Sequence, residues 1–188
     1  MLLMALCIGS CKNTKEKEIV YNDKIQDTFF GATFGASKED VVKAICNHSF
    51  GYQPSLFDED TRQSFIKIDT NTHTTVERFS FGNMLWEMLD VWYCNNLFHQ
   101  IRFMNAHKSK ESALRDFENV LSTVSSKYHL YEPSIDDTNT YRLFEGKTNE
   151  GLWVSISCFR YESISHDIYV GVDLSYGDNN YTSVSNEL

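Results

Sequence analysis

Apolar and polar residues alternate along residues 167–176, and this pattern restricts the fold more than any other part of the chain. A period of two puts every second side chain on one face of a β-strand, so one face of this strand is expected to be buried. Its apolar positions are Ile168, Val170, Val172, Leu174 and Tyr176. Similar patterns predict strands at residues 65–68, 75–81, 85–93, 97–104, 141–146 and 152–161. The chain is therefore expected to build an antiparallel sheet.

Two further segments carry helix signals. Ser37 followed three residues later by Asp40 is typical of a helix start, because both side chains satisfy unpaired N–H groups of the first turn. This helix is expected over residues 37–47, where it would bury Val42, Ile45 and Cys46. A second helix, capped by Ser109, is predicted over residues 109–128 from helical spacing of Ala113, Phe117, Val120, Leu121, Val124 and Tyr128. The expected fold class is α+β, with two helices packed on the antiparallel sheet.

Residues 85–93 and 97–104 form the clearest predicted hairpin. A three-residue loop would pair Tyr93 with Leu97, whereas a two-residue turn would mix the two faces, so the pattern favours the longer loop. In this register the buried face carries Leu89, Val91, Tyr93, Leu97, Ile101 and Phe103, with His99 among them. The opposite face carries Asp90, Trp92, Phe98, Gln100 and Arg102.

The two halves of the chain resemble each other. Ser-Lys-Glu opens both helices, at Ser37 and Ser109, and an Arg…Gly…Leu-Trp…Tyr pattern follows in both, from Arg78 and from Arg142. The repetition indicates a duplicated α-β-β-β unit, and the alternative is that two α+β segments converged on similar patterns. The expected organisation is a signal at residues 1–11, a tether at 12–28, units at 29–106 and 107–177, and a frayed tail at 178–188.

Residues 1–11 are apolar and small and end at Cys11, after which residues 12–18 are mostly charged. The apolar run is too short to span a bilayer, which takes about 20 residues, and it has the length of a signal h-region. Small residues before a cysteine are typical of a bacterial lipoprotein signal, so Cys11 is predicted to be lipidated; the alternative is a buried first strand. The signal interpretation places the protein in the bacterial cell envelope, lipid-anchored to the outer membrane and facing the periplasm or the cell surface.

The chain of 188 residues has a net charge of −9, which restricts its partners. An acidic surface repels phosphate backbones, so nucleic-acid binding is disfavoured. It also avoids anionic head groups, so membrane contact is expected through the lipid anchor only. Cys46 and Cys158 follow apolar patterns and are expected to be buried, whereas Cys94 is expected to be exposed in the hairpin loop. A Cys46–Cys158 disulfide is the alternative state of the two buried thiols.

The sequence contains no recognisable catalytic or cofactor motif. It has no GxSxG, HExxH, P-loop or GxGxxG pattern, and no Cys/His cluster at zinc spacing. Acidic runs at residues 58–60 and 136–137 lack the alternating ligands and the glycine of a calcium loop. His99 is expected to be a half-buried strand residue. We therefore expect no enzymatic activity, no cofactor and no metal site.

One resemblance can be stated. The run Gly35-Ala-Ser37-Lys-Glu-Asp-Val41, a helix, and a meander with an aromatic hairpin ending in Asn95-Asn96-Leu97 resemble the small lipoprotein of the outer-membrane β-barrel assembly machinery and the tandem units of the β-lactamase inhibitor protein. The lipidation signal and composition are similar to those of Bacteroides-type lipoproteins. The chain departs from these families in its long connection at residues 47–63 and its wide turn at 147–151. The resemblance implies a non-enzymatic module that docks protein partners, and no functional residue carries over.

The candidate partner-binding residues are Trp92, Phe98, Gln100 and Arg102. Trp92 and Phe98 are expected to pair across the hairpin on its outer face, where they would form an exposed apolar patch of the kind that marks partner sites. The alternative is that a second layer of the protein covers them. An envelope protein is the expected partner of a binding or assembly module. A glycan is the alternative ligand, for binding or hydrolysis, because exposed Trp and Tyr beside carboxylates suit sugar rings.

Overall fold

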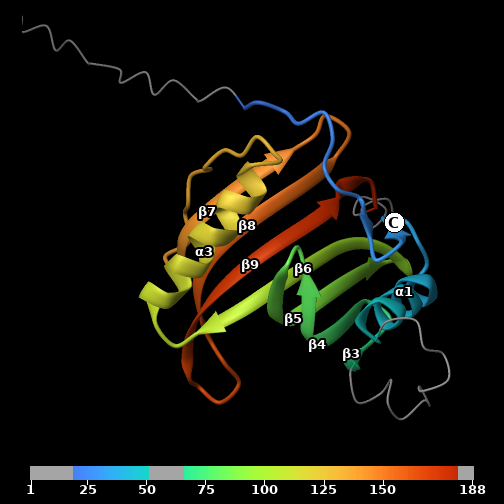
Figure 1. The fold of residues 1–188 in the computed structure, drawn as a ribbon, viewed down its shortest axis with the longest axis horizontal. Helices are drawn as coiled ribbons and strands as arrows, with labels where there is room; N and C mark the ends of the chain where they lie inside the picture. Colours follow the sequence, from blue (N-terminus) through green and yellow to red (C-terminus); the bar gives the residue numbers. More distant parts are fainter. Residues whose placement is uncertain (1–18, 51–65, 182–188) are drawn as a thin grey trace, which may run out of the picture.

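The computed structural model describes residues 19–50 and 66–181, and these residues form one large sheet with two α-helices (Figure 1). Each of the seven predicted strands overlaps a strand of this sheet. The strands are β3 (Ile66–Asp69), β4 (His73–Phe81), β5 (Met84–Cys94), β6 (Leu97–His107), β7 (Thr140–Lys147), β8 (Leu152–Glu162) and β9 (Ile168–Asp178). The α+β fold class is confirmed, and β-strands hold more of the described residues than the helices do.

The sheet is antiparallel throughout, in the order β3-β4-β5-β6-β9-β8-β7. Its centre is the pairing of β6 with β9, so strands from the two halves of the sequence share one continuous sheet. A small separate sheet pairs β1 (Thr28–Phe29) with β2 (Ala32–Thr33), which the sequence pattern did not predict. The predicted units 29–106 and 107–177 therefore do not form separate sheets.

Both helices begin where their capping residues predict. Before α1 (Lys38–Phe50), the Ser37 hydroxyl accepts the Asp40 N–H and donates to the Asp40 carboxylate at 2.8 Å. Before α3 (Lys110–Ser125), the Ser109 hydroxyl accepts the Ser112 N–H at 3.2 Å. Helix α1 buries Val41, Ile45 and Cys46. Val42, which was predicted to be buried, is only half-buried, and Val41 takes its place in the core.

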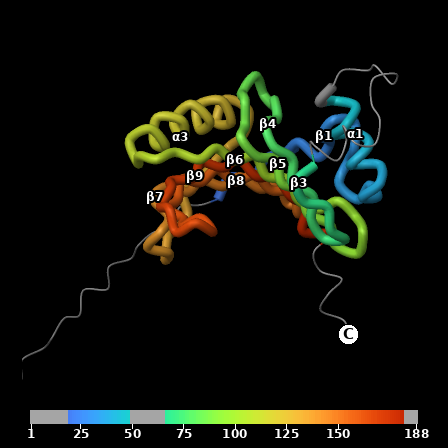
Figure 2. The backbone as a smooth tube through the Cα atoms, turned by 90° about the horizontal axis from the view of Figure 1, so that it is seen from below, coloured from blue at the N-terminus to red at the C-terminus, as the bar shows by residue number. Residues whose placement is uncertain are grey.

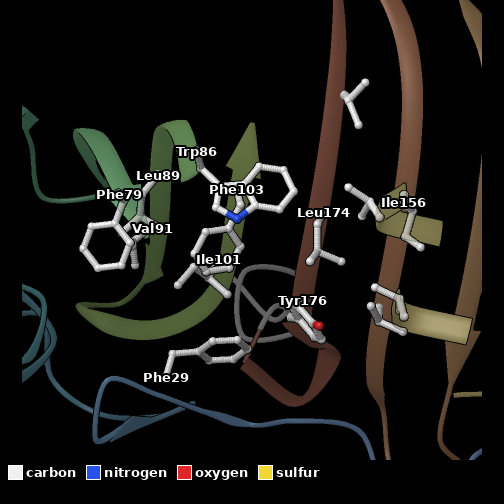
Figure 3. Close-up of a cluster of buried hydrophobic side chains, with 14 of the residues drawn as sticks. Phe29, Phe79, Trp86, Leu89, Val91, Ile101, Phe103, Ile156, Leu174 and Tyr176 are labelled. Carbon is white, nitrogen blue, oxygen red and sulfur yellow. The ribbon is translucent and has the colours of Figure 1, made fainter. Parts of the chain in front are cut away.

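The two helices lie on the same side of the sheet (Figure 2). Their inward residues join the inward residues of the strands in a single apolar core. Figure 3 shows part of this core, where Phe29 approaches Tyr176 of β9 with ring centroids 5.1 Å apart. Within the described ranges, no helix is long and apolar enough to cross a membrane.

The N-terminal segment completes the cover of this side, and it corrects the expected tether for residues 19–28. Ile25 and Phe29 are buried in the core, and the Asn22 side chain donates to the His129 carbonyl at 3.0 Å. Ile25 is the one apolar residue among residues 22–28, so the segment has no periodic pattern that would predict its packing. The remainder of the predicted tether, residues 12–18, and the signal with Cys11 lie outside the described residues.

The hairpin between β5 and β6 differs from its predicted register. Its turn has two residues, Asn95 and Asn96, both with positive φ (51° and 65°), and Cys94 pairs with Leu97. A bulge at His99 then shifts the pairing by one residue, so that Trp92 lies opposite Gln100. The bulge absorbs the mixing of faces that a two-residue turn would otherwise cause.

The C-terminal boundary also differs from the prediction of a frayed tail from residue 178. Strand β9 extends to Asp178, and a short 3₁₀ helix, η2 (Asn179–Tyr181), follows it. The Tyr181 ring lies directly over Gly35, where an added Cβ would be 2.4 Å from the Tyr181 hydroxyl oxygen. Residues 182–188 lie outside the described part of the chain.

The cysteines lie close to where their patterns predict. Cys46 and Cys158 are buried, as expected, whereas Cys94 is half-buried and not fully exposed. Cys158 carries a free thiol, so the alternative Cys46–Cys158 disulfide is not formed.

Candidate functional site

The sheet has a second face that neither helix covers, and we call it the helix-free face (Figure 2). It consists of the outward side chains of β4, β5, β6, β9 and β8. The strand register aligns one row of residues across it, each opposite the next: His73, Trp92, Gln100, Gly177 and Trp153. Apart from the buried glycine, these residues are half-buried. Three strand spacings separate the backbones of the two tryptophans, about 14 Å at the usual 4.8 Å spacing.

Trp92 is held by its neighbour on β4. The His73 ring stacks on the Trp92 indole, with ring centroids 5.0 Å apart and planes 14° apart. His73 Nε2 in turn lies 3.1 Å from the Asp90 carboxylate, which accepts the Thr75 hydroxyl at 2.7 Å. Asp90 and Thr75 are buried, so this network fixes the orientation of Trp92 before any partner arrives.

Trp153 lies flat against the sheet because β9 has a glycine beneath it. A Cβ at Gly177 would meet the indole at 2.3 Å (Cζ2), 2.4 Å (Cε2) and 2.7 Å (Nε1). A glycine inside a strand often marks such a close approach. This glycine is the available sequence signal, but it is the last residue of the predicted second unit, and its pattern alone does not identify Trp153 as a site residue.

Arg102 is on this face as predicted, but its charge is already engaged. Its Nε lies 3.0 Å from the Asp173 carboxylate, and its guanidinium lies over the Phe159 ring at 5.4 Å from the centroid. The Ser157 hydroxyl donates to the same carboxylate at 2.7 Å. Burial raises the pKa of Asp173, and the Arg102 charge opposes that rise. Arg102 therefore acts first as an internal partner of Asp173.

Phe98 does not belong to this face, and its expected exposure is wrong. The bulge at His99 turns Phe98 inward, where it is fully buried and packs on Phe34 with ring centroids 4.7 Å apart. Leu97, predicted to be buried, is 37% exposed for the same reason. The expected Trp92–Phe98 pair is therefore absent, and Trp92 lies opposite Gln100. Of the four candidate residues, the structure places Trp92, Gln100 and Arg102 together on the helix-free face.

A second cluster of polar groups links β6 to α3 on the covered side. His107 lies 3.1 Å from the Ser112 hydroxyl through Nδ1 and 3.0 Å from the Asp116 carboxylate through Nε2. Asn105 donates to the same carboxylate at 3.1 Å. These three contacts tie the strand to the first two turns of the helix, which accounts for them without any chemistry.

Other titratable residues give less support for a chemical role. Burial lowers the pKa of His99, which disfavours its charged form. Asp137 accepts the Asn139 N–H and the Thr140 hydroxyl, so it organises its own loop. Among the described residues, no group of three or more His, Cys, Asp or Glu side chains could hold a metal ion. The acidic run at residues 58–60 falls outside them.

No protein-family model matches the chain, and comparison with curated proteins and with solved structures finds no significant match.

Proposed function

We propose that this chain is a non-enzymatic binding module that docks a protein of the cell envelope on its helix-free face. The observation that carries this proposal is the one-sided cover of the sheet. Both helices and the N-terminal segment pack on one face, while Trp92, Gln100 and Trp153 remain half-buried on the other. Large aromatic side chains held in fixed orientations dominate binding energetics in protein interfaces.

We also propose that the module is lipid-anchored through Cys11 to the bacterial outer membrane. The support is the apolar run that ends at Cys11, followed by charged residues 12–18. An acidic body on such an anchor would approach partners from the membrane surface without adsorbing to anionic lipid. The resemblance to small envelope lipoproteins supports the same location.

A duplicated α-β-β-β unit remains our proposal for the origin of this architecture. In the sheet order, β4-β5-β6 from the first half is followed by β9-β8-β7 from the second, so corresponding strands occupy mirrored places about the β6–β9 pair. The helix that precedes each set of strands packs into the same core. This arrangement leaves the opposite face uncovered in both halves.

A glycan is the second candidate ligand, and one observation favours it. The Gln100 amide and the indole N–H groups of Trp92 and Trp153 make no hydrogen bond to any residue that the structure describes, so they are available to sugar hydroxyls. Hydrolysis has less support than binding. Glycoside hydrolysis needs two available carboxyl groups, whereas the carboxylates of Asp90 near Trp92 and Asp173 near Arg102 are both engaged by neighbouring side chains.

The anchor is tested by mass spectrometry of protein from the membrane fraction. We expect a mature N-terminus at a lipid-modified Cys11 and a Cys11→Ala variant that no longer partitions into detergent. An unmodified Met1 at the N-terminus, or a variant that partitions like wild type, would contradict the anchor.

The docking face is tested by pull-down from crosslinked envelopes. Trp92→Ala and Trp153→Ala should each reduce capture of the partner, while Asn119→Ala on the exposed surface of α3 should leave it unchanged. Equal capture by all three variants would contradict the proposed face. Binding of purified oligosaccharides, lost on the same Trp substitutions, would favour the glycan alternative.

A further inference from the structure

The helix-free face carries an open groove of about 980 Å³ at the end of the sheet away from the tryptophan row. One wall comes from β4 and β5, and the other from the turn after β8 that includes Ile164. Ile164 is fully exposed at the rim. The groove is adjacent to the central strands but uses none of the residues of the tryptophan row.

The floor of the groove is apolar and adaptable. Met88 of β5 lies opposite Met104 of β6 in the strand register, and Tyr161 of β8 stacks on Tyr169. Met104 is 9% exposed and its sulfur accepts from Arg102 Nη2 at 2.9 Å, whereas Met88 is half-buried. The Met88 side chain is unbranched and polarizable, so it can adjust to apolar groups of different shapes, as methionines do at surfaces that bind peptides. One face of the Tyr161 ring is already taken by Tyr169, which leaves less flat aromatic surface for a sugar ring.

The rim of the groove is acidic. Glu77, Glu87 and Glu162 line it, and Arg78 is the cation among its lining residues. Lys67 Nζ lies 3.6 Å from the Glu77 carboxylate and His166 contacts Glu162, but all four side chains are exposed, so these surface pairs can open for a cationic ligand at little cost. Burial, followed by the charge of Glu87, raises the pKa of Tyr161 at the floor. The excess of negative charge repels phosphate and carboxylate ligands and attracts cationic ones.

The backbone of β4 is irregular at Arg78, which lines the groove. Its φ of 56° is rare for a residue other than glycine, and it follows Glu77 in a pair of adjacent exposed residues within β4. Beyond this point the alternation of β4 is shifted, so Phe79 enters the core while Glu77 and Arg78 both face solvent. The irregular backbone thus places two charged side chains, Glu77 and Arg78, at the groove.

We propose that this groove binds a lysine- or arginine-rich segment of the protein partner, with one apolar side chain of that segment resting on Met88 and Met104. The inference rests on the proposed docking function and adds the chemistry of the segment that is recognised. The acidic rim supplies charge complementarity, and the methionine floor supplies the apolar contact. The overall charge of −9 reinforces the same preference.

The probe is a fluorescent lysine-rich peptide with one central leucine, added to the full chain in phosphatidylcholine vesicles, with empty vesicles as the blank. Two matched peptides replace the leucine by serine or the lysines by glutamate. Anisotropy should show the tightest binding for the first peptide, weaker binding for the serine peptide and none for the glutamate peptide. Equal binding of the glutamate peptide, or displacement by a neutral oligosaccharide, would overturn the proposal.

Variants of the protein locate the binding. The double variant with Glu77→Gln and Glu162→Gln should raise the Kd of the peptide by up to about tenfold at low salt. Met88→Gln should raise it by about fivefold. The control pair Glu132→Gln with Glu150→Gln makes the same charge change away from the groove and should have little effect. Equal weakening by both pairs would show attraction to net charge alone and overturn the groove.

The same variants separate this inference from the docking proposal. If the groove variants capture the envelope partner like wild type while Trp92→Ala and Trp153→Ala lose it, the groove proposal fails and the docking face stands. If neither set of variants loses the partner, both proposals fail. Loss of capture in both sets supports both.

Discussion

Gly177→Ala is the substitution that most sharply tests the geometry of the helix-free face. The new Cβ would lie 2.3 Å from Cζ2 of Trp153, although carbon atoms in contact lie about 3.5 to 4.0 Å apart. The indole therefore has to leave its place on the sheet. Gly177 does not have a positive φ, so alanine fits the backbone itself.

Two opposing effects set the expected change in the free energy of unfolding for Gly177→Ala. Overpacking costs about 1 to 3 kcal/mol, while replacing glycine by alanine at a compatible position stabilises by about 0.4 to 1 kcal/mol through the unfolded chain. The net expectation for Gly177→Ala is a loss of about 1 to 2 kcal/mol. In a Trp153→Ala background the clash is gone, so the same substitution should stabilise the protein by about 0.4 to 1 kcal/mol.

The assay is a double-mutant cycle of denaturant melts followed by circular dichroism. The sign of the Gly177→Ala effect should reverse between the two backgrounds. The same loss in both backgrounds, or stabilisation of the protein that retains Trp153, would refute the placement of the indole over this glycine. Gly171→Ala offers a parallel cycle with Phe159, whose Cζ would lie 2.7 Å from the new Cβ.

Three other outcomes follow from the packing. Phe98→Ala should cost about 3 to 5 kcal/mol in denaturant melts, because Phe98 is fully buried, while Leu97→Ala beside it should cost within about 1 kcal/mol; equal costs would contradict the bulged register. In a soluble form beginning after residue 11, a maleimide should label Cys94 quickly and Cys158 slowly, since burial raises the pKa of Cys158 to about 11; three fast sites, or none, would be inconsistent with this. Burial raises the pKa of Tyr93 from 10.0 to about 12, so its contribution to stability is present below pH 10 and is lost as the pH rises through 12. Between pH 10 and pH 12 the free energy of unfolding should therefore fall by roughly 2 to 3 kcal/mol less for Tyr93→Phe than for wild type. An equal fall in the two proteins would argue against a buried phenol.

The strands and helix starts could be predicted because local rules decide them. Alternation along β9 and the caps at Ser37 and Ser109 depend on neighbours within a few residues. The hairpin register could not be predicted, because it depends on a single bulge at His99. A bulge leaves no periodic pattern in the sequence.

The candidate site was predicted in part for the same reason. Trp92 and Gln100 stay on the outer face because they lie on the far side of the bulge from the turn, whereas Phe98 lies between the bulge and the turn and changes face. Trp153 was missed because its position depends on Gly177, which is 24 residues along the chain but adjacent in the sheet. Pairings between distant strands require the sheet order, which no local pattern supplies.

Site-specific photo-crosslinking in living cells tests the central claim of a docking face most directly. A photoreactive residue would replace Gln100 on the helix-free face in one variant and Asn119 on the exposed surface of α3 in the other. We expect a defined adduct with an envelope protein from position 100 and none from position 119. An adduct of equal or greater yield from position 119, or no adduct from position 100, would contradict docking on the helix-free face.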